Sequence, residues 1–391
     1  MASVSGNIRK MYVIKILTWF MVMIPVIVPF YQENGLSLQE VLIVQAFFAI
    51  SLVIFEIPSG YFADVYGRKR AMVLGSVLSF GGYLLYCYST SFYQFLFAEF
   101  WLGVGCSFLS GADSALIYES LLQRKLEGVY QQVEGRFQAM GSFSEAVASV
   151  LGGFIAVVSL RYTVYAQAII YFLAIPFTLS LVEPKAHHED LSVEQTRGIW
   201  KVVKYSLHGH KEVKWLILFG ALIGSATFNV VWFVQPYFEQ VGLPLIWFGV
   251  VWAVFQVSVG VFSLFAHRVE QRWGERRSLL LLLLIPLLAY LSTGFFYSLW
   301  ALPLFLLFYF TRGIKGPVLR DYVNKLVPSA IRATVLSVES MCMRMIFVFI
   351  GPVAGWIADQ YGLPASFYGL GLFFGVAGGI SLLMLSRYRA L

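Results

Sequence analysis

Nine ionisable side chains interrupt stretches of this sequence that are otherwise apolar. Charge held within hydrocarbon is costly, so each of these side chains is a candidate for function. A carboxylate in such a place can load and release a proton, because its pKa rises on desolvation and falls beside a cation. An arginine or lysine there suits the carboxylate or phosphate of a ligand. The acids are Glu56, Glu99, Asp113, Glu145 and Glu339, and the bases are Lys15, Arg312, Lys315 and Arg344.

The acids and bases are distributed unevenly, with four of the five acids in the first half and three of the four bases in the second. Glu99 and Asp113 are fourteen residues apart, close to four helical turns, so a continuous helix would present both on one stripe. Arg312 and Lys315 are three residues apart and nearly share a helical face. We therefore expect acids of the first half to carry protons and cations of the second half to bind an anionic ligand. The expected proton carriers are Asp113, Glu145, Glu99 and Glu56, and the expected ligand-binding cations are Arg312, Lys315 and Arg344.

Two of the nine lie near the ends of their apolar stretches. Glu56 precedes Pro58 by two residues and is a candidate gate or proton site, the alternative being a side chain that snorkels to the interface. Lys15 is also near enough to an end to snorkel, so we do not expect it to contact a ligand.

The composition is that of an integral membrane protein. Of 391 residues, 59% are hydrophobic and 13% are charged, whereas a soluble domain carries about 25% charged residues. The net charge of +7 is accounted for by membrane topology, so we expect no nucleic-acid partner. Cys87, Cys106 and Cys342 lack metal-ligand spacing and are expected to be buried small side chains.

Charged and turn-rich breaks divide the chain into twelve apolar segments, which predicts an all-α fold with twelve transmembrane helices. Six fall within 1–182 and six within 214–391, and the interval 183–213 between them is polar. Apolar positions over 199–207 share one face, which predicts an interfacial amphipathic helix in this linker. His187 and His188 are expected to be solvated. The expected spans are roughly 11–31, 38–62, 71–89, 93–117, 136–158, 162–182, 214–238, 244–266, 277–297, 300–321, 333–357 and 364–386.

Lysines and arginines fall on alternate loops, and Arg161 is the single exception. The positive-inside rule then places both termini and the linker in the cytoplasm of a cell-membrane protein. Arg9 and Lys10 precede an apolar run that has no small-residue cleavage site, so we interpret that run as a retained first span.

A weak internal repeat supports two pseudo-symmetric six-helix bundles. The cations after Gly67 have a counterpart after Gly274, and the stretch 111–119 aligns without gaps on 313–321, which pairs span four with span ten. Two related halves with a ligand site between them and rocking motion are typical of transporters.

Between the second and third expected spans, residues 60–70 contain two glycines that bracket an acid, followed by three cations. This stretch resembles the loop signature of the major facilitator superfamily, roughly G-x-L-A-D-x-x-G-R-K, with Phe62 in place of the aliphatic residue. The matching residues are Gly60, Ala63, Asp64, Gly67, Arg68 and Lys69.

The resemblance implies a charge cluster at the cytoplasmic ends of the spans. Asp64 would meet Arg332 and the N-terminus of span eleven, and Arg68 would meet Glu119. Such a cluster closes the cytoplasmic side when the protein faces outward. The expected gating residues are Gly60, Asp64, Gly67, Arg68, Lys69, Glu119 and Arg332.

The resemblance also implies that spans one, four, seven and ten line a central cavity, so that Asp113 and Lys315 would face it. An ion pair that only holds the halves together is the alternative for these two residues. Gly313, Gly316 and Pro317 are expected to interrupt span ten and free backbone groups for a ligand. The other expected ligand contacts are Asn229, Trp232, Gln256 and Tyr309.

Drug:proton antiporters of this superfamily carry G-x-x-x-G-P-x-x-G-G late in span five. Here the corresponding positions hold small residues, and only the final pair, Gly152 and Gly153, matches. The small residues should still allow span five to pack closely against neighbouring helices, but this incomplete motif does not establish export.

Together these features predict a proton-coupled secondary active transporter that works by alternating access and exports a small amphipathic compound, anionic or zwitterionic. The alternative is proton-coupled import of an anionic metabolite or siderophore, and a non-transporting membrane receptor fits less well. No phosphate-binding loop and no nucleophile–base or metal-ligand cluster is visible, so we expect neither an enzyme nor a cofactor, and a proton gradient as the energy source. The expected partners are the lipid bilayer, protons and the small-molecule substrate, with the protein a monomer.

Overall fold

The computed structural model describes residues 6–184, 209–328 and 331–389, and every regular element in these ranges is a helix. The amphipathic helix expected over 199–207, with His187 and His188, lies outside the described residues. Up to the linker, the helices are α1 Asn7–Trp19, η2 Ile24–Val26, α2 Ile27–Glu33, α3 Leu38–Tyr66, α4 Arg68–Tyr88, α5 Phe92–Leu109, α6 Ala112–Leu122, η3 Glu127–Val129, α7 Tyr130–Val158 and α8 Leu160–Leu179. Beyond it, they are α10 Lys211–Gln240, α11 Ile246–Phe295, η5 Leu299–Phe305, α12 Leu306–Leu326, α13 Arg332–Tyr361 and α14 Leu363–Arg389.

Eleven described helical segments are long and apolar enough to cross a membrane. One of them, α11, has 50 residues, or about 75 Å of helix, which is more than twice the thickness of the hydrocarbon core. Gly274 inside α11 has φ 72° and ψ 173°, which are not helical angles, so one span lies on each side of this residue. The twelve expected transmembrane helices are therefore present.

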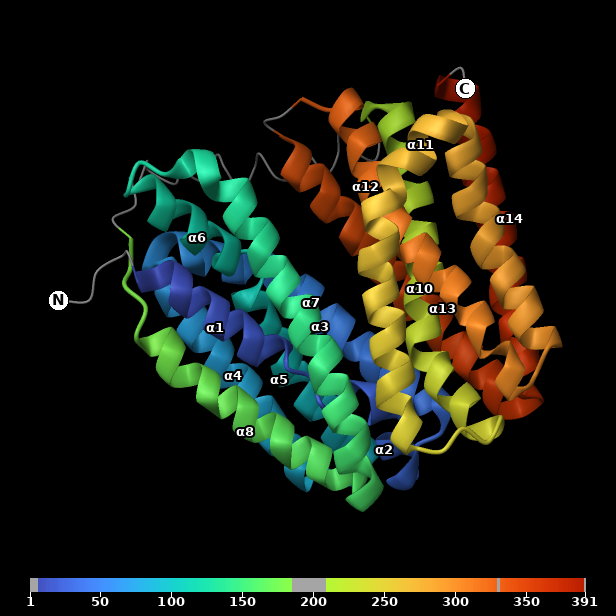
Figure 1. The fold of residues 1–391 in the computed structure, drawn as a ribbon, viewed down its shortest axis with the longest axis horizontal. Helices are drawn as coiled ribbons and strands as arrows, with labels where there is room; N and C mark the ends of the chain where they lie inside the picture. The colour runs from blue at the N-terminus through green and yellow to red at the C-terminus, as the bar shows by residue number, and fades with distance from the viewer. Residues whose placement is uncertain (1–5, 185–208, 329–330, 390–391) are drawn as a thin grey trace. The chain divides into compact units, whose positions relative to one another are not determined.

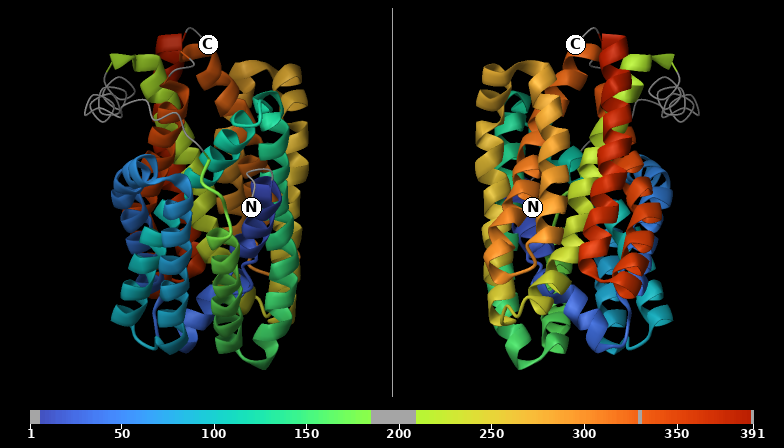
Figure 2. Two further views of the ribbon diagram at one scale, coloured as in Figure 1. Left: turned by 90° about the vertical axis from the view of Figure 1, so that its left-hand side faces the viewer. Right: turned by 90° about the vertical axis from the view of Figure 1, so that its right-hand side faces the viewer.

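The chain divides into two compact units. The first comprises Met1–Leu36, Phe47–Leu191 and Leu245–Ala253, and the second comprises Ser37–Ala46, Ser192–Pro244 and Val254–Leu391. Each unit has its own apolar core, which includes Met11, Leu116 and Phe137 in the first and Phe219 and Tyr322 in the second. In the first unit α1 packs against α7 and α8, and α4 packs against α5 and α8 (Figure 1). In the second unit α10 packs against α12, α13 and α14 (Figure 2).

The first span is broken in its middle. Helix α1 ends at Trp19, and Phe20 has the non-helical angles φ −80° and ψ 72°. The short helix η2 then begins with Ile24 and Pro25, and Pro25 has no N–H with which to continue a helical ladder. The chain resumes an α-helical path at α2.

The fourth span is also broken, and this corrects one expectation. Helix α5 ends at Leu109 and α6 begins at Ala112, because Ser110 is extended and Gly111 has φ 80°. Glu99 and Asp113 therefore lie on different helices, and the prediction that they share one continuous stripe was wrong. The prediction assumed one continuous helix, whereas Gly111 adopts a left-handed backbone conformation that favours glycine and ends the helical path.

Span ten, which was expected to be interrupted, is continuous. Helix α12 runs through Gly313, Gly316 and Pro317 without a break. The helix breaks are found in spans one and four instead.

Small residues on α7 allow close packing within the first unit. A Cβ atom on Gly152 would lie 2.0 Å from the carbonyl oxygen of Val22, beside the break in span one. A Cβ atom on Gly249 of α11 would lie 1.9 Å from the carbonyl oxygen of Ser149 on α7. Gly152 and Gly153, the two glycines that match the antiporter motif, thus both lie in close backbone contact, since a Cβ atom on Gly153 would be 3.1 Å from the backbone nitrogen of Gly249.

Candidate functional site

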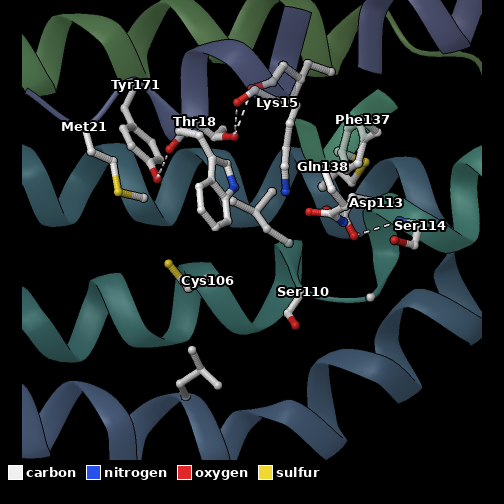
Figure 3. A pocket seen from close by; sticks show the side chains of 16 residues that line it. Lys15, Thr18, Met21, Cys106, Ser110, Asp113, Ser114, Phe137, Gln138 and Tyr171 are labelled. Carbon is white, nitrogen blue, oxygen red and sulfur yellow. Dashed lines mark hydrogen bonds between the residues drawn. The ribbon is translucent and has the colours of Figure 1, made fainter. Parts of the chain in front are cut away.

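The breaks in spans one and four border a cavity of about 410 Å³ in the first unit (Figure 3). Met21 from the first break and Ser110 and Gly111 from the second line it. Discontinuous helices are a frequent way to build a transporter site, because their ends offer free backbone groups and partial charges to a ligand. The ionisable and amide side chains that line the cavity are Lys15, Cys106, Asp113, Gln138 and Tyr171.

Lys15 extends from α1 into this cavity (Figure 3). Its side chain is only 5% exposed, and Nζ lies 4.3 Å from the ring centroid of Trp19 and 4.7 Å from that of Phe137. Gly141 on α7 makes room for it, because a Cβ atom there would be 2.7 Å from Lys15 Cε. The expectation that Lys15 snorkels was wrong, since two aromatic rings and a glycine hold its amine inside the unit.

Asp113 lies in the first turn of α6, near the side chain of Lys15 (Figure 3). Its Oδ1 accepts a hydrogen bond from the backbone N–H of Ser114 at 2.7 Å, and the positive end of the helix dipole favours a carboxylate there. Lys15 and Asp113 interact electrostatically, although they form no direct ion pair. Protonation of Asp113 would therefore change the charge that surrounds Lys15.

Glu134 on α7 is a third charged group near this pair, and it was missed because span five was expected to begin at 136. Its Oε1 accepts hydrogen bonds from Ser114 Oγ at 2.9 Å and Gln138 Nε2 at 2.7 Å. Its charge is thus held at the edge of the cavity by two polar side chains.

The other expected proton carriers do not line the cavity. Glu99 is 4% exposed and accepts a hydrogen bond from Tyr31 Oη at 3.0 Å and another from Tyr86 Oη. Glu145 is 8% exposed, with Oε1 3.5 Å from Trp252 Nε1. Glu56 is half-buried on α3. Of these four acids, Asp113 alone is placed at the cavity.

In the second unit, Lys315 pairs with Glu339 at 2.7 Å, and both side chains are largely buried. The acid that pairs with Lys315 is thus Glu339 of the same unit, and not Asp113, the partner considered from the sequence. Glu339 reaches from α13 to α12 to form this pair. Arg344 is half-buried, and Arg312 is exposed.

The expected polar and aromatic ligand contacts of the second unit are mostly buried. Asn229 is fully buried and donates to the carbonyl oxygen of Ser225 at 2.8 Å, but its Oδ1 has no partner within the part of the chain that the structure describes. Trp232 is 7% exposed, and its Nε1 likewise has no partner among the described residues. Tyr309 stacks on an aromatic ring of α11, and Gln256 is half-buried.

Three of the expected gating residues, Asp64, Arg68 and Glu119, form an ionic cluster in the first unit. Arg68 Nε lies 3.2 Å from Glu119 Oε1, and Arg68 also forms an ion pair with Asp64. Lys69 occupies the next position of α4, and Gly60 lies on the exposed surface of α3. Arg332 donates to the carbonyl oxygens of Val327 at 2.9 Å and Asn324 at 2.8 Å, at the end of α12.

Glu183, which sequence reasoning missed, completes this cluster. Its carboxylate accepts hydrogen bonds from the backbone N–H groups of Arg68 at 2.7 Å and Lys69 at 2.9 Å, at the N-terminus of α4. Gly67, with φ 106°, brings the chain close enough, because a Cβ atom there would lie 2.7 Å from the carboxylate. Asn7 binds Val182, the residue before Glu183, through two hydrogen bonds. An acid directly before Pro184 was the only signal in the sequence.

The family model of the Major Facilitator Superfamily matches residues 11–338. The chain belongs to this superfamily. It is therefore a multi-pass membrane protein that carries out secondary transport, and not an enzyme. An uncharacterized MFS-type transporter, YxaM of Bacillus subtilis (strain 168), is 21% identical over 83% of this chain and 82% of its own length. Multidrug resistance protein 2 of the same organism is 25% identical over 69% of this chain and 68% of its own length.

Solved structures of the Major Facilitator Superfamily share the fold. The nucleoside transporter NupG has a TM-score of 0.77 at 14% identity, over 99% of this chain and 98% of its own. A bacterial homologue of the human lysosomal transporter Spinster has a TM-score of 0.80 at 14% identity, over 99% and 98%. The D-xylose-proton symporter has a TM-score of 0.74 at 15% identity, over 98% and 97%. At these identities the likeness supports the fold alone.

Proposed function

We propose that this superfamily member couples proton movement to the transport of a small amphipathic organic compound with an anionic group. The observation that carries the proposal is the cavity in which Lys15 and Asp113 lie near each other at the breaks of spans one and four. Asp113 is the proposed proton carrier, because a carboxylate near a cation titrates according to how the cavity is solvated and occupied.

The direction of transport has two candidates. Export is the direction expected from the sequence, and the 25% identical multidrug resistance protein supports it. Uptake of an anionic metabolite or siderophore is the second candidate, and the buried cation Lys15 suits the carboxylate or phosphate of such a compound. The two candidates differ in whether the compound and the proton cross the membrane in opposite directions or together.

The test uses purified protein in liposomes that enclose a pH-sensitive dye, with organic anions and lipophilic cations added in turn. We expect organic anions to drive proton movement, and the sign of the dye response distinguishes exchange from co-transport. Asp113→Asn should abolish this proton movement while exchange of the compound across the liposome membrane continues. The exposed second-unit variant Asp321→Asn is the matched control and should behave as the parent.

Two outcomes would contradict the proposal. Proton movement that persists in Asp113→Asn but is lost in Glu145→Gln would place coupling at Glu145. Proton movement driven by lipophilic cations and by no organic anion would contradict the proposed ligand class.

We further propose that the signature cluster, with Asp64, Arg68 and Glu119, is the cytoplasmic gate. The ion pairs of Arg68 with both acids support this role, because such a cluster can stabilise one closed state.

The alternation of cations between loops supports cytoplasmic termini in the cell membrane. We propose a monomer as the working unit, which light scattering of the purified protein in detergent would test.

A further inference from the structure

The ammonium group of Lys15 is buried, and no described residue gives it a hydrogen bond or an ion pair. Within the residues that the structure describes, Nζ makes no hydrogen bond and no ion pair, and its contacts are the faces of Trp19 and Phe137. A lysine has three N–H donors, and removing such a group from water without replacing its hydrogen bonds is costly. The two rings compensate the charge in part, but they leave the donors on the cavity side unused.

The cavity supplies the space for a group that would satisfy these donors. Its volume of about 410 Å³ lies in the range of sites for small organic molecules. Apolar side chains such as Leu52 and Met72 line it as well, so a ligand with an apolar body and one anionic group would match its walls. Gly111 offers open space on the side of the helix break.

Asp113 competes with such a ligand for Lys15, because its carboxylate lies near the Lys15 side chain (Figure 3). While it is ionised, it repels an incoming anion, and protonation removes this repulsion. Among the described residues, the other titratable groups near the pair on the surrounding helices are Cys106 on α5, Tyr130 and Glu134 on α7, and Tyr171 on α8. Glu134 is held by Ser114 and Gln138 and adds repulsion of the same sign as Asp113.

We propose that Lys15 binds the anionic group of the transported compound and that this compound and the proton on Asp113 bind together. The proposal rests on the proposed function and specifies both the ligand contact and the sign of coupling. By thermodynamic reciprocity, the proton raises the affinity for the anion and the anion raises the affinity for the proton. Joint binding is the condition for co-transport, whereas exchange requires that the proton and the compound exclude each other. The uptake candidate follows from this sign of coupling where the proton gradient points inward.

The experiment measures binding of aryl sulfonates with one, two and three rings to the full-length protein in lipid nanodiscs. A sulfonate keeps its charge between pH 5.5 and 7.5, so any pH dependence belongs to the protein, and the matching neutral sulfonamides report the apolar contribution. We expect at least one sulfonate to bind about tenfold more tightly at pH 5.5 than at pH 7.5. Asp113→Asn should bind it tightly at both pH values, and Lys15→Gln should bind it about tenfold or more weakly at both. Lys15→Arg should retain binding, and Arg124→Gln, an exposed charge removal in the same unit, should match the parent.

Several results would overturn the proposal: no sulfonate binding to the parent, equal binding of sulfonate and sulfonamide, tighter binding at pH 7.5, or parental affinity in Lys15→Gln. The liposome assay separates this failure from failure of the proposed function. Coupled proton movement that is unaffected by Lys15→Gln would refute the role of Lys15 and leave proton-coupled transport standing. The expected binding pattern without any coupled proton movement would leave the anion site standing and refute the proposed coupling.

Discussion

Glu183 lies outside the loop signature and binds the backbone of two of its residues at the start of α4. The first N–H groups of a helix have no partner within the helix, and the helix dipole makes its N-terminus attractive to a carboxylate. Glu183 satisfies two of these groups, from Arg68 and Lys69, while the Arg68 side chain turns to Glu119. The backbone and the side chain of Arg68 are thus held by different acids.

Replacing Glu183 should therefore loosen the start of α4. We expect Glu183→Ala to lower the free energy of unfolding by about 1 kcal/mol, since it removes a helix cap, and Glu183→Gln to lower it less because an amide oxygen still accepts hydrogen bonds. Thermal unfolding in detergent micelles, followed by circular dichroism, measures the change. Glu127→Ala removes an exposed acid of the same unit and serves as the control. Equal midpoints for Glu183→Ala and this control would contradict the capping role.

The break between α5 and α6 places Asp113 at a helix terminus rather than in the middle of a long helix. This placement depends on Gly111, whose φ of 80° is strained for any residue with a side chain. The break also separates Ser110, which lies at the end of one helix, from Asp113, which lies at the start of the next.

We expect Gly111→Ala to destabilise the protein by about 1 kcal/mol and to weaken the pH dependence of sulfonate binding, because Asp113 would move. Gly316→Ala is a matched control within the part of span ten that aligns with this segment. Gly316 lies inside α12 with open space at its Cβ position, so alanine there should be neutral or stabilising by about 0.5–1 kcal/mol. Identical stability and pH dependence in the two variants would show that the break does not position Asp113.

The same two elements show what the sequence could and could not predict. Hydropathy located all twelve spans, because twenty apolar residues in a row are a local property of the chain. The break at Gly111 was not predicted, because a glycine inside a transmembrane stretch is compatible with both a continuous and a broken helix. Pro317 was expected to break span ten, but α12 accommodates it.

The residues that contact buried charged groups could not be predicted from the sequence either. The pair of Lys315 and Glu339 joins the consecutive helices α12 and α13, and the contact of Lys15 with Phe137 joins α1 and α7. Sequence spacing reports on which residues share a face of one helix, and it does not report on which faces meet. Lys15 was set aside because it lies near the end of its apolar stretch, and the contact with Phe137 on α7 could not be read from the sequence.

The two units handle their buried cations differently. Lys315 in the second unit is neutralised by Glu339 at 2.7 Å, whereas Lys15 in the first unit has no ion pair among the described residues. The expected symmetry of the two halves therefore extends to the layout of the helices and not to the charges they enclose. The cation of the second unit is therefore neutralised by a protein carboxylate, whereas among the described residues the cation of the first unit is not, and it can bind the anionic group of a ligand.

Removing one partner of the closed pair should be costly. We expect Glu339→Gln to lower the free energy of unfolding by about 1–3 kcal/mol, because it leaves the Lys315 ammonium largely buried with a weaker partner. The double variant Lys315→Met with Glu339→Gln should recover most of this loss. A double-mutant cycle measured by unfolding in mixed micelles tests the coupling. Strictly additive losses would mean that the pair contributes nothing to stability.

The closeness of Lys15 and Asp113 has a consequence for the energy source. If one proton accompanies one monovalent anion, the two charges cancel. The loaded and the empty protein then have the same net charge, and the transport cycle moves no net charge across the membrane. A membrane potential acts on each transferred charge with about 2.3 kcal/mol per 100 mV, so here it would have nothing to act on. The concentration ratio that this protein can sustain would then follow the pH difference alone, about tenfold for each pH unit, and a depolarised cell would keep it.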